Sequence, residues 1–167
     1  ANISTSIAAA RKLFNIKDQN IKKGITKIDL KGRLQEINYG KIKDLVGSNK
    51  LFCDGGHNIN AAKVIANWIK QQNKDVHLIV GMMKDKDHKG FIQCFQDNVK
   101  SITLIDIPNH EGCISKEELK EKLNGIRIEI NLSDSIEESI KAINKYEDDL
   151  CLIIGSLYLV GEVLNLN

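Results

Sequence analysis

The sequence predicts an α/β fold of the Rossmann-like kind, a mostly parallel open sheet with helices on both faces. Five short runs rich in valine, isoleucine and leucine recur along the chain, and segments with an apolar residue every third or fourth position separate them. Strands joined by helix-length connections run parallel, because such a connection returns the chain to the same edge of the sheet. The chain has 167 residues, 42% of them hydrophobic, which is enough for one substantial core.

In chain order, we expect strands at residues 51–53, 76–80, 102–107, 126–130 and 150–154. Polar and apolar residues alternate at 127–130, which is typical of an edge strand. Helices are expected around residues 62–69, 91–95, 119–123 and 136–143, each with one apolar face. Two helices begin with capping boxes, Ser115 with Glu118 and Ser135 with Glu138. In this motif the serine hydroxyl accepts a hydrogen bond from a first-turn amide and the glutamate reaches back.

The first 30 residues differ from the rest of the chain. Ile3, Ile7, Ala10 and Phe14 predict one amphipathic helix, whereas residues 15–30 are polar and basic with little periodicity. We therefore predict two parts, residues 1–30 as a remnant of another domain with a linker, and residues 31–167 as the α/β domain.

Charge and composition exclude several classes of partner. Twenty-four basic and 22 acidic residues give a net charge of +2, too small an excess for sequence-independent binding to nucleic acid. No apolar run approaches the roughly 20 residues that cross a bilayer, and no secretory signal is recognisable, so we expect a cytoplasmic protein without a membrane partner. The four cysteines form no C-x-x-C pair, which favours reduced thiols and no metal site.

Three unusual loops follow predicted strands at their carboxyl ends. They are residues 53–58 (CDGGHN), 81–87 (GMMKDKD) and 155–156 (GS). Each also has an ordinary explanation: a tight turn with Asn58 capping the next helix, a solvated charged loop, and Ser156 as a simple N-cap. Because the carboxyl ends of parallel strands share one edge of the sheet, their convergence there favours a site for an anionic ligand. Neither a P-loop nor a dinucleotide-binding glycine motif occurs in the chain.

Four ordered motifs carry a family resemblance. They are residues 32–35 (GRLQ), 54–58 (DGGHN), 81–87 (GMMKDKD) and 155–162 (GSLYLVGE). Their order and spacing resemble the C-terminal domain of bifunctional dihydrofolate synthase/folylpolyglutamate synthase, in the Mur ligase superfamily. Asn2 with Ala8 and Ala9 is similar to the helix that ends the family's ATPase domain, although the His-Gln that usually precedes it is absent. Gly56 stands where the family more often has alanine.

The resemblance implies a ligase that uses ATP to activate a dihydropteroate or folate carboxylate as an acyl phosphate, which the amino group of glutamate then attacks. ATP and Mg²⁺ would be its cofactors. The P-loop and the magnesium ligands would lie in an N-terminal ATPase domain that this chain lacks. The chain alone is therefore expected to be inactive, with that domain, glutamate and a folate or pteroate as its partners.

The resemblance also implies three catalytic side chains. Arg33 would neutralise phosphate charge during transfer, a role that suits a forked guanidinium. His57 would position the attacking amine or the acyl phosphate, and so would also bind substrate. Lys86 would hold glutamate or offset charge in the tetrahedral intermediate.

Binding roles follow in the same way. Asn2 would contact the adenine edge and Asp54 the ribose, while Arg33 would share the nucleotide site. Ser156, at a helix N-terminus, would bind a glutamate carboxylate.

Two other functions fit the same residues. One is a non-enzymatic α/β module that binds an anion or a nucleotide. The other is the domain of a peptidoglycan-precursor Mur ligase, which the ending at residues 155–162 disfavours because it resembles the folate branch.

Overall fold

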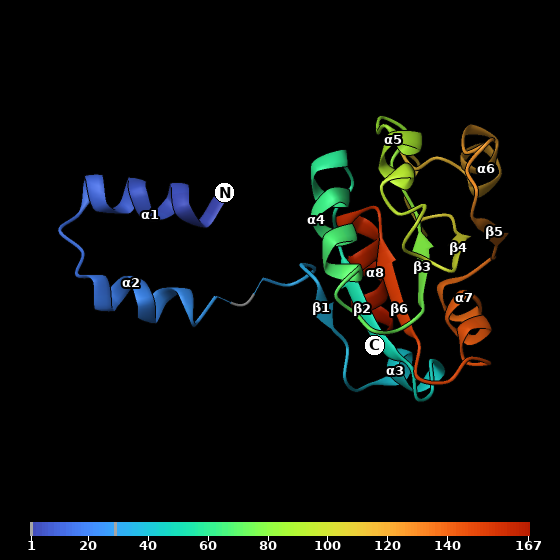
Figure 1. Ribbon diagram of the computed structural model, residues 1–167, viewed down its shortest axis with the longest axis horizontal. Helices are drawn as coiled ribbons and strands as arrows, with labels where there is room; N and C mark the ends of the chain where they lie inside the picture. The colour runs from blue at the N-terminus through green and yellow to red at the C-terminus, as the bar shows by residue number, and fades with distance from the viewer. Residues whose placement is uncertain (1, 29) are drawn as a thin grey trace. The chain divides into compact units, whose positions relative to one another are not determined.

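The computed structural model describes residues 2–28 and 30–167, except for the side chain of Asn2. The chain divides into two compact units, Ala1–Lys31 and Gly32–Asn167 (Figure 1). This boundary falls one residue after the one expected from the sequence. Within the described residues no helix is long and apolar enough to cross a membrane.

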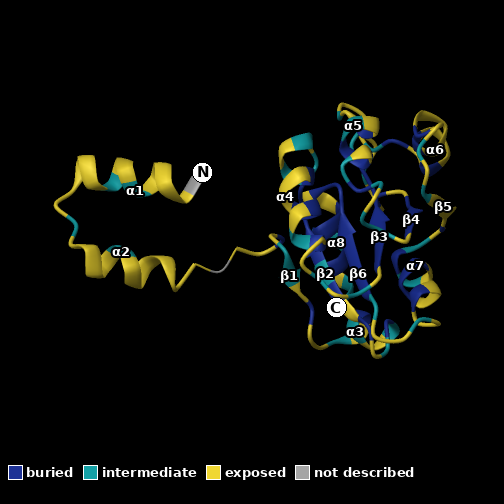
Figure 2. Ribbon diagram, in the orientation of Figure 1, coloured by how far each residue is buried: buried dark blue, intermediate teal, exposed yellow. Residues whose placement is uncertain are grey.

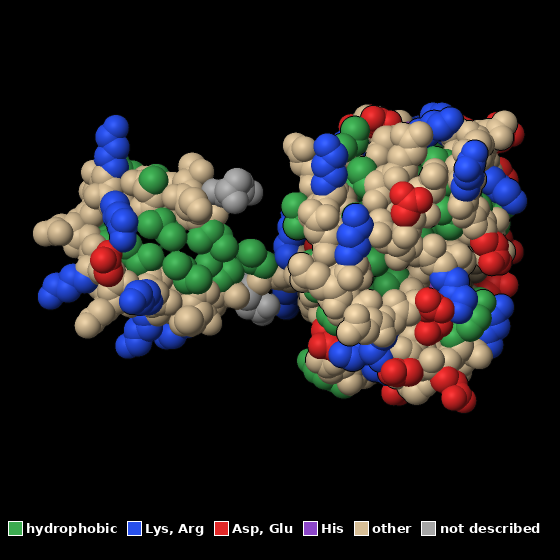
Figure 3. Space-filling model, viewed as in Figure 1, with side chains coloured by type: hydrophobic (Ala, Val, Ile, Leu, Met, Phe, Trp, Pro, Cys, Tyr) green, Lys and Arg blue, Asp and Glu red, His purple; other side chains and the backbone are tan. Residues whose placement is uncertain are grey.

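The first unit contains two helices. Helix α1, Asn2–Leu13, is the amphipathic helix expected from the sequence. Helix α2, Asp18–Ile25, was not predicted, and treating residues 15–30 as irregular was wrong. It was missed because only two isoleucines, Ile21 and Ile25, form its apolar face within a polar and basic segment. Asp18, at the start of α2, forms a 2.6 Å ion pair with Arg11. Apolar side chains gather between these helices (Figure 3).

The second unit is built on a six-stranded sheet in the order β1-β2-β6-β3-β4-β5. The strands are β1, Gln35–Glu36; β2, Lys50–Asp54; β3, Val76–Val80; β4, Ser101–Leu104; β5, Glu129–Leu132; and β6, Leu150–Ile154. Strand β1 is antiparallel to β2, and the other four pairs are parallel. The predicted mostly parallel open sheet is confirmed.

The largest differences from the predicted strands are at β1, β4 and β5, while β2 is one residue longer than expected at each end. Strand β1 was missed because two residues carry no periodic signal. Strand β4 ends at Leu104 instead of residue 107, because residues 105–107 continue into a loop while their isoleucines stay buried. Strand β5 begins at Glu129, three residues later than expected, but it is an edge strand as predicted.

Helices cover both faces of the sheet (Figures 1 and 2). One face packs against α4, Ile59–Ile69, α5, His88–Gln93, and α6, Lys116–Lys122. The other packs against α3, Lys41–Leu45, α7, Ile136–Ile143, and α8, Leu157–Leu166. Successive strand residues point to opposite faces of the sheet: Leu78 and Leu152 pack against the first group of helices, and Ile79 and Ile153 against the second. Each such side chain, when fully buried, contributes roughly 1.5–3 kcal/mol.

The two predicted capping boxes are half formed. Ser115 Oγ accepts from the Glu118 amide at 3.2 Å, and Ser135 Oγ accepts from the Glu138 amide at 3.0 Å. The returning contacts differ from the prediction. Glu138 accepts from the amide of Asp134, one residue before the cap, and Glu118 pairs with Lys122 one turn later. Lysine at i+4 competes for the carboxylate in α6.

Candidate functional site

The three singled-out loops leave neighbouring strands at the same edge of the sheet. Asp54 and Val80 both pair with Ile154, so β2, β6 and β3 end at one level. The Gly155 amide donates to Gly56 O at 3.1 Å, which ties two of the loops together. Gly155 has a φ of +111°, and a Cβ there would lie 2.6 Å from the Gly81 carbonyl oxygen. Glycine is therefore required at the point where the loops meet. We call this edge of the sheet, with its loops at residues 53–58, 81–87 and 155–156, the rim.

Asp54 organises the rim through the backbone. Its carboxylate accepts from the Leu34 amide at 2.8 Å and from the Gly56 amide at 2.6 Å. The side chain is buried, with the residue 6% exposed. Leu34 has a φ of +43°, a left-handed conformation that costs a non-glycine residue free energy. The hydrogen bond from Leu34 to Asp54 holds this conformation, so that Asp54 joins the loop before β1 to the loop after β2.

Arg33 sits on that joined loop. Its Nη1 donates to Gly32 O at 3.3 Å, and the residue is exposed. Among the described residues it has no carboxylate partner. A Cβ at Gly55 would lie 3.1 Å from Nη1, so glycine leaves the space in which the guanidinium lies over the loop. The rim thus carries an uncommitted, planar cation.

His57 and Lys86 come from two of the loops. His57 Nδ1 lies 2.9 Å from Gly55 O, which requires the proton on Nδ1 and leaves Nε2 as an acceptor. Lys86 forms a 2.7 Å ion pair with Asp85 and, chiefly through this hydrogen bond, holds the pKa of Asp85 below its usual range. A weaker electrostatic contribution to that pKa comes from His57, which places the two loops in electrostatic reach.

Two rim residues, Asn58 and Ser156, form the helix-capping contacts that the sequence offered as their ordinary explanation. Asn58 caps α4, with its side-chain oxygen accepting from the Ala61 amide at 2.9 Å. Ser156 caps α8 and accepts from the Tyr158 amide at 3.1 Å. The Ser156 hydroxyl keeps its proton available to donate, although the residue is only 3% exposed.

The predicted role of Asn2 stays a prediction, because its side chain lies outside the described residues; its helix belongs to the first unit. No described part of the chain gathers three or more histidine, cysteine or acidic side chains that could hold a metal ion. Cys53, next to Asp54, is buried, and burial raises the pKa of its thiol to about 12, so it stays protonated at neutral pH.

Sequence reasoning missed His88. Its Nε2 lies 3.0 Å from the Met83 carbonyl oxygen, and the residue is 4% exposed. His88 therefore shapes the loop at 81–87, whose last residue, Asp87, caps α5. No spacing or pattern in the sequence distinguishes His88 from the charged residues before it.

The model of the family "Mur ligase, glutamate ligase domain" matches residues 33–157. The chain belongs to this family. The match starts at Arg33 and ends just after Ser156, so this Mur ligase domain contains the rim from its first loop to its last.

Relatives of the Mur ligase domain include the dihydrofolate synthase/folylpolyglutamate synthase of Haemophilus influenzae, 27% identical over 97% of this chain and 41% of that protein. The structure of E. coli FolC in complex with ADP matches with a TM-score of 0.77 and 25% identity, over 98% of this chain and 38% of that one. The Yersinia pestis bifunctional enzyme complexed with AMPPNP and Mn shares the fold, with a TM-score of 0.73 and 24% identity over 90% of this chain and 34% of that one. The chain spans less than half the length of these proteins.

Proposed function

We propose that this chain is the C-terminal part of an ATP-dependent ligase that adds glutamate to dihydropteroate or folates through an acyl phosphate. The observation that carries the proposal is Arg33, an uncommitted guanidinium held on a turn that Asp54 fixes at the rim. The names of the relatives support the substrate class, and the complexes with ADP and AMPPNP support the nucleotide.

In this proposal the rim supplies charge and orientation. Arg33 neutralises charge on the phosphoryl group as it moves to the carboxylate, because a guanidinium can contact two oxygens at once. Asp54 holds the turn, and the remaining lone pairs of its carboxylate accept from a ribose hydroxyl. We also place Asn2 at the adenine edge, as the resemblance implies.

The amine attack is assigned to the other loops. His57 Nε2 accepts a hydrogen bond from the attacking amine of glutamate, while Nδ1 stays on Gly55 O. Lys86 exchanges its exposed partner Asp85 for a glutamate carboxylate, at little cost because exposed ion pairs contribute little. Ser156 donates its hydroxyl proton to a glutamate carboxylate, assisted by the N-terminus of α8.

The remaining machinery is placed outside this chain. We propose that the P-loop and the Mg²⁺ ligands belong to an ATPase domain that works with this one in the cytoplasm. The 167-residue chain should therefore show no ATP hydrolysis with dihydropteroate, folate and glutamate present. If the 167-residue chain hydrolyses ATP above background, and Arg33→Ala abolishes that hydrolysis, the assignment of the P-loop and the Mg²⁺ ligands to another domain is contradicted.

The direct test is Arg33→Ala in the full-length ligase. We expect turnover to fall by about a thousandfold, the lower end of the effect of an arginine at a phosphoryl-transfer site. Lys31→Ala is the matched control, since Lys31 is an exposed cation two residues away. ADP release and glutamate incorporation should fall together. If Arg33→Ala turns over as fast as Lys31→Ala, the domain is better described as a non-enzymatic anion-binding module.

A further inference from the structure

A second polar site lies away from the rim, between helix α7 and the sheet. A cleft of about 240 Å³ is lined by His77 from β3, Ser101 and Thr103 from β4, and Ser139 from α7. The opposite face of these two strands is apolar, with Leu78, Ile102 and Leu104. A sheet face beneath a helix is normally apolar too. The hydroxyls and the imidazole in this cleft therefore need an explanation.

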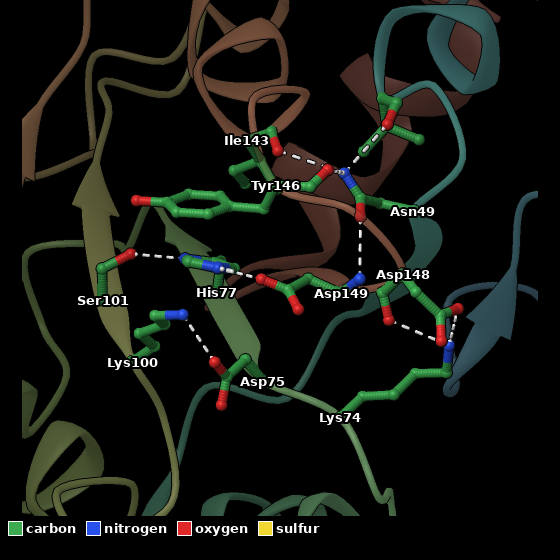
Figure 4. Close-up of polar contacts among 11 residues, drawn as sticks. Asn49, Lys74, Asp75, His77, Lys100, Ser101, Ile143, Tyr146, Asp148 and Asp149 are labelled. Carbon is green, nitrogen blue, oxygen red and sulfur yellow. Dashed lines mark hydrogen bonds and ion pairs between the residues drawn. The ribbon is translucent and has the colours of Figure 1, made fainter.

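Ser101, His77 and Asp149 form a chain of hydrogen bonds (Figure 4). Ser101 Oγ lies 2.7 Å from His77 Nδ1, and His77 Nε2 lies 3.1 Å from Asp149 Oδ2. An ionised carboxylate can only accept, so the proton of a neutral imidazole is on Nε2 and Nδ1 presents its lone pair. Ser101 must then donate its hydroxyl proton to Nδ1. The hydrogen bonds run in the same direction as in a triad of serine nucleophile, histidine base and orienting acid. Here Nδ1 faces the serine and Nε2 the acid, the reverse of their places in serine proteases.

The base and the acid are both held in place. The His77 ring stacks on Tyr146 with centroids 4.4 Å apart and planes inclined by 18°. The Asp149 amide donates to Asn49, a fully buried side chain that also bonds to the Ile143 and Tyr146 carbonyls. Their neighbouring charges, Lys100 and Asp75, are paired with each other at 2.5 Å. The imidazole thus cannot turn away from Ser101 without breaking this network.

The cleft also offers a donor for a developing oxyanion. Thr103 is two residues further along the same face of β4, about 7 Å from Ser101 at the usual rise of a strand. It is 8% exposed, and within residues 2–28 and 30–167 its hydroxyl makes no side-chain hydrogen bond. An unpartnered hydroxyl that faces a cleft can donate to an oxygen carried by a group bound at Ser101.

We propose that Ser101 is a nucleophilic serine that accepts an acyl group from a small activated ester. Ser101 Oγ attacks the ester carbonyl carbon as its proton passes to His77 Nδ1, and Asp149 stabilises the imidazolium at Nε2. Thr103 donates to the carbonyl oxygen while it carries negative charge. The carbon–oxygen bond to the alcohol then breaks, the alcohol takes the proton from Nδ1, and an ester on Ser101 remains.

This site is separate from the rim. Its serine and histidine pair with each other at the amino ends of β3 and β4, whereas the rim loops leave the carboxyl ends of β2, β3 and β6. Ligase activity and acylation can therefore be tested independently.

The test is to incubate the 167-residue chain with p-nitrophenyl acetate and to map acetyl groups by tandem mass spectrometry. Alkaline hydroxylamine removes acetyl from serine esters but not from lysine amides, whereas neutral hydroxylamine already removes it from cysteine thioesters, so the two treatments separate the expected product from lysine and cysteine background. We expect one acetyl group that only alkaline hydroxylamine removes, on Ser101. Ser101→Ala should lose it, whereas Ser139→Ala, which removes another hydroxyl of the same cleft, should keep it.

Two further variants test the base and the acid. His77→Gln should slow acetylation of Ser101 by about 100-fold, the usual contribution of a general base. Asp149→Ala, at a partly exposed position, leaves the hydrogen bond from its backbone amide to Asn49 in place and should cause a smaller decrease. Circular dichroism checks that each variant is folded. Absence of an ester on Ser101 in the unmodified chain, or an unchanged rate in folded Asp149→Ala, would overturn the proposal and leave the three residues as a structural tether.

Discussion

The two ends of the sheet use polar side chains in opposite ways. At the carboxyl ends, glycines and backbone amides build the rim, and Arg33 makes one hydrogen bond, to Gly32 O, with no carboxylate partner among the described residues. At the amino ends, the polar side chains are bonded within the protein: His77 to Ser101 and Asp149, and Asn49 to backbone groups that include the Asp149 amide. A donor without a partner can form a hydrogen bond to a substrate. A donor that is already bonded stabilises the packing of the strands or, at Ser101, is polarised by its partner.

Asn49→Ala should have the largest effect on folding, and it tests whether bonded polar side chains at the amino ends of the strands stabilise the fold. The side chain is fully buried, donates to three carbonyls and accepts from the Asp149 amide. Leaving these groups without partners should lower the free energy of unfolding by about 3 kcal/mol. Urea denaturation measures this change. Asn38→Ala, at an exposed asparagine, is the control and should stay within about 0.5 kcal/mol of the unmodified chain.

Asp54→Ala should combine a smaller folding defect with a functional one. Two amides lose their acceptor and Leu34 loses the contact that holds its left-handed conformation, so unfolding should become easier by about 2 kcal/mol. In the full-length ligase the apparent KM for ATP should rise more than that for glutamate. Steady-state kinetics that place the whole defect on glutamate would move Asp54 away from the nucleotide side.

Variants of Ser156 distinguish a role in capping helix α8 from a role in binding glutamate. Ser156→Ala should lower stability by about 1 kcal/mol, and Ser156→Asn should largely restore the cap. If Ser156 also donates to glutamate, both variants should raise the KM for glutamate in the full-length ligase while ATP dependence stays near normal. Recovery of both the melting temperature and that KM in Ser156→Asn would leave Ser156 with capping alone.

The smallest effect is expected from pH, at the exposed ion pair between Lys100 and Asp75 beside the second site. A hydrogen bond from Lys100 lowers the pKa of Asp75 in the folded chain. A lowered folded-state pKa stabilises the fold above the ordinary value of 3.8, and this contribution disappears as the pH falls through the folded-state value. Asp75→Asn should therefore destabilise slightly at about pH 6 and not at about pH 2.5. Urea midpoints at both pH values check it, and equal differences would contradict it.

Much of the fold was predictable from the sequence, because apolar periodicity specifies buried strands and amphipathic helices directly. Strand β1 was missed because two residues carry no periodic signal, and helix α2 because its apolar face consists of only Ile21 and Ile25 among polar and basic residues. The place of the rim followed from parallel topology. The contacts within it did not, because Asp54 binds the Leu34 amide, which is 20 residues away in sequence. The Ser101–His77–Asp149 chain was likewise hidden, because its three residues lie far apart in sequence and form no recognisable motif.

The central claim is that the nucleotide and glutamate bind at the rim and not at the amino ends of the strands. Amide chemical shifts of the ¹⁵N-labelled chain, followed by NMR during titration with AMPPNP and then L-glutamate, test this directly. We expect saturable shifts at Gly55, Gly56, Gly81 and Gly155, which Arg33→Ala weakens for AMPPNP, and none at His77 or Ser101. Shifts confined to His77 and Ser101, or no saturable shift at the rim glycines, would contradict the account.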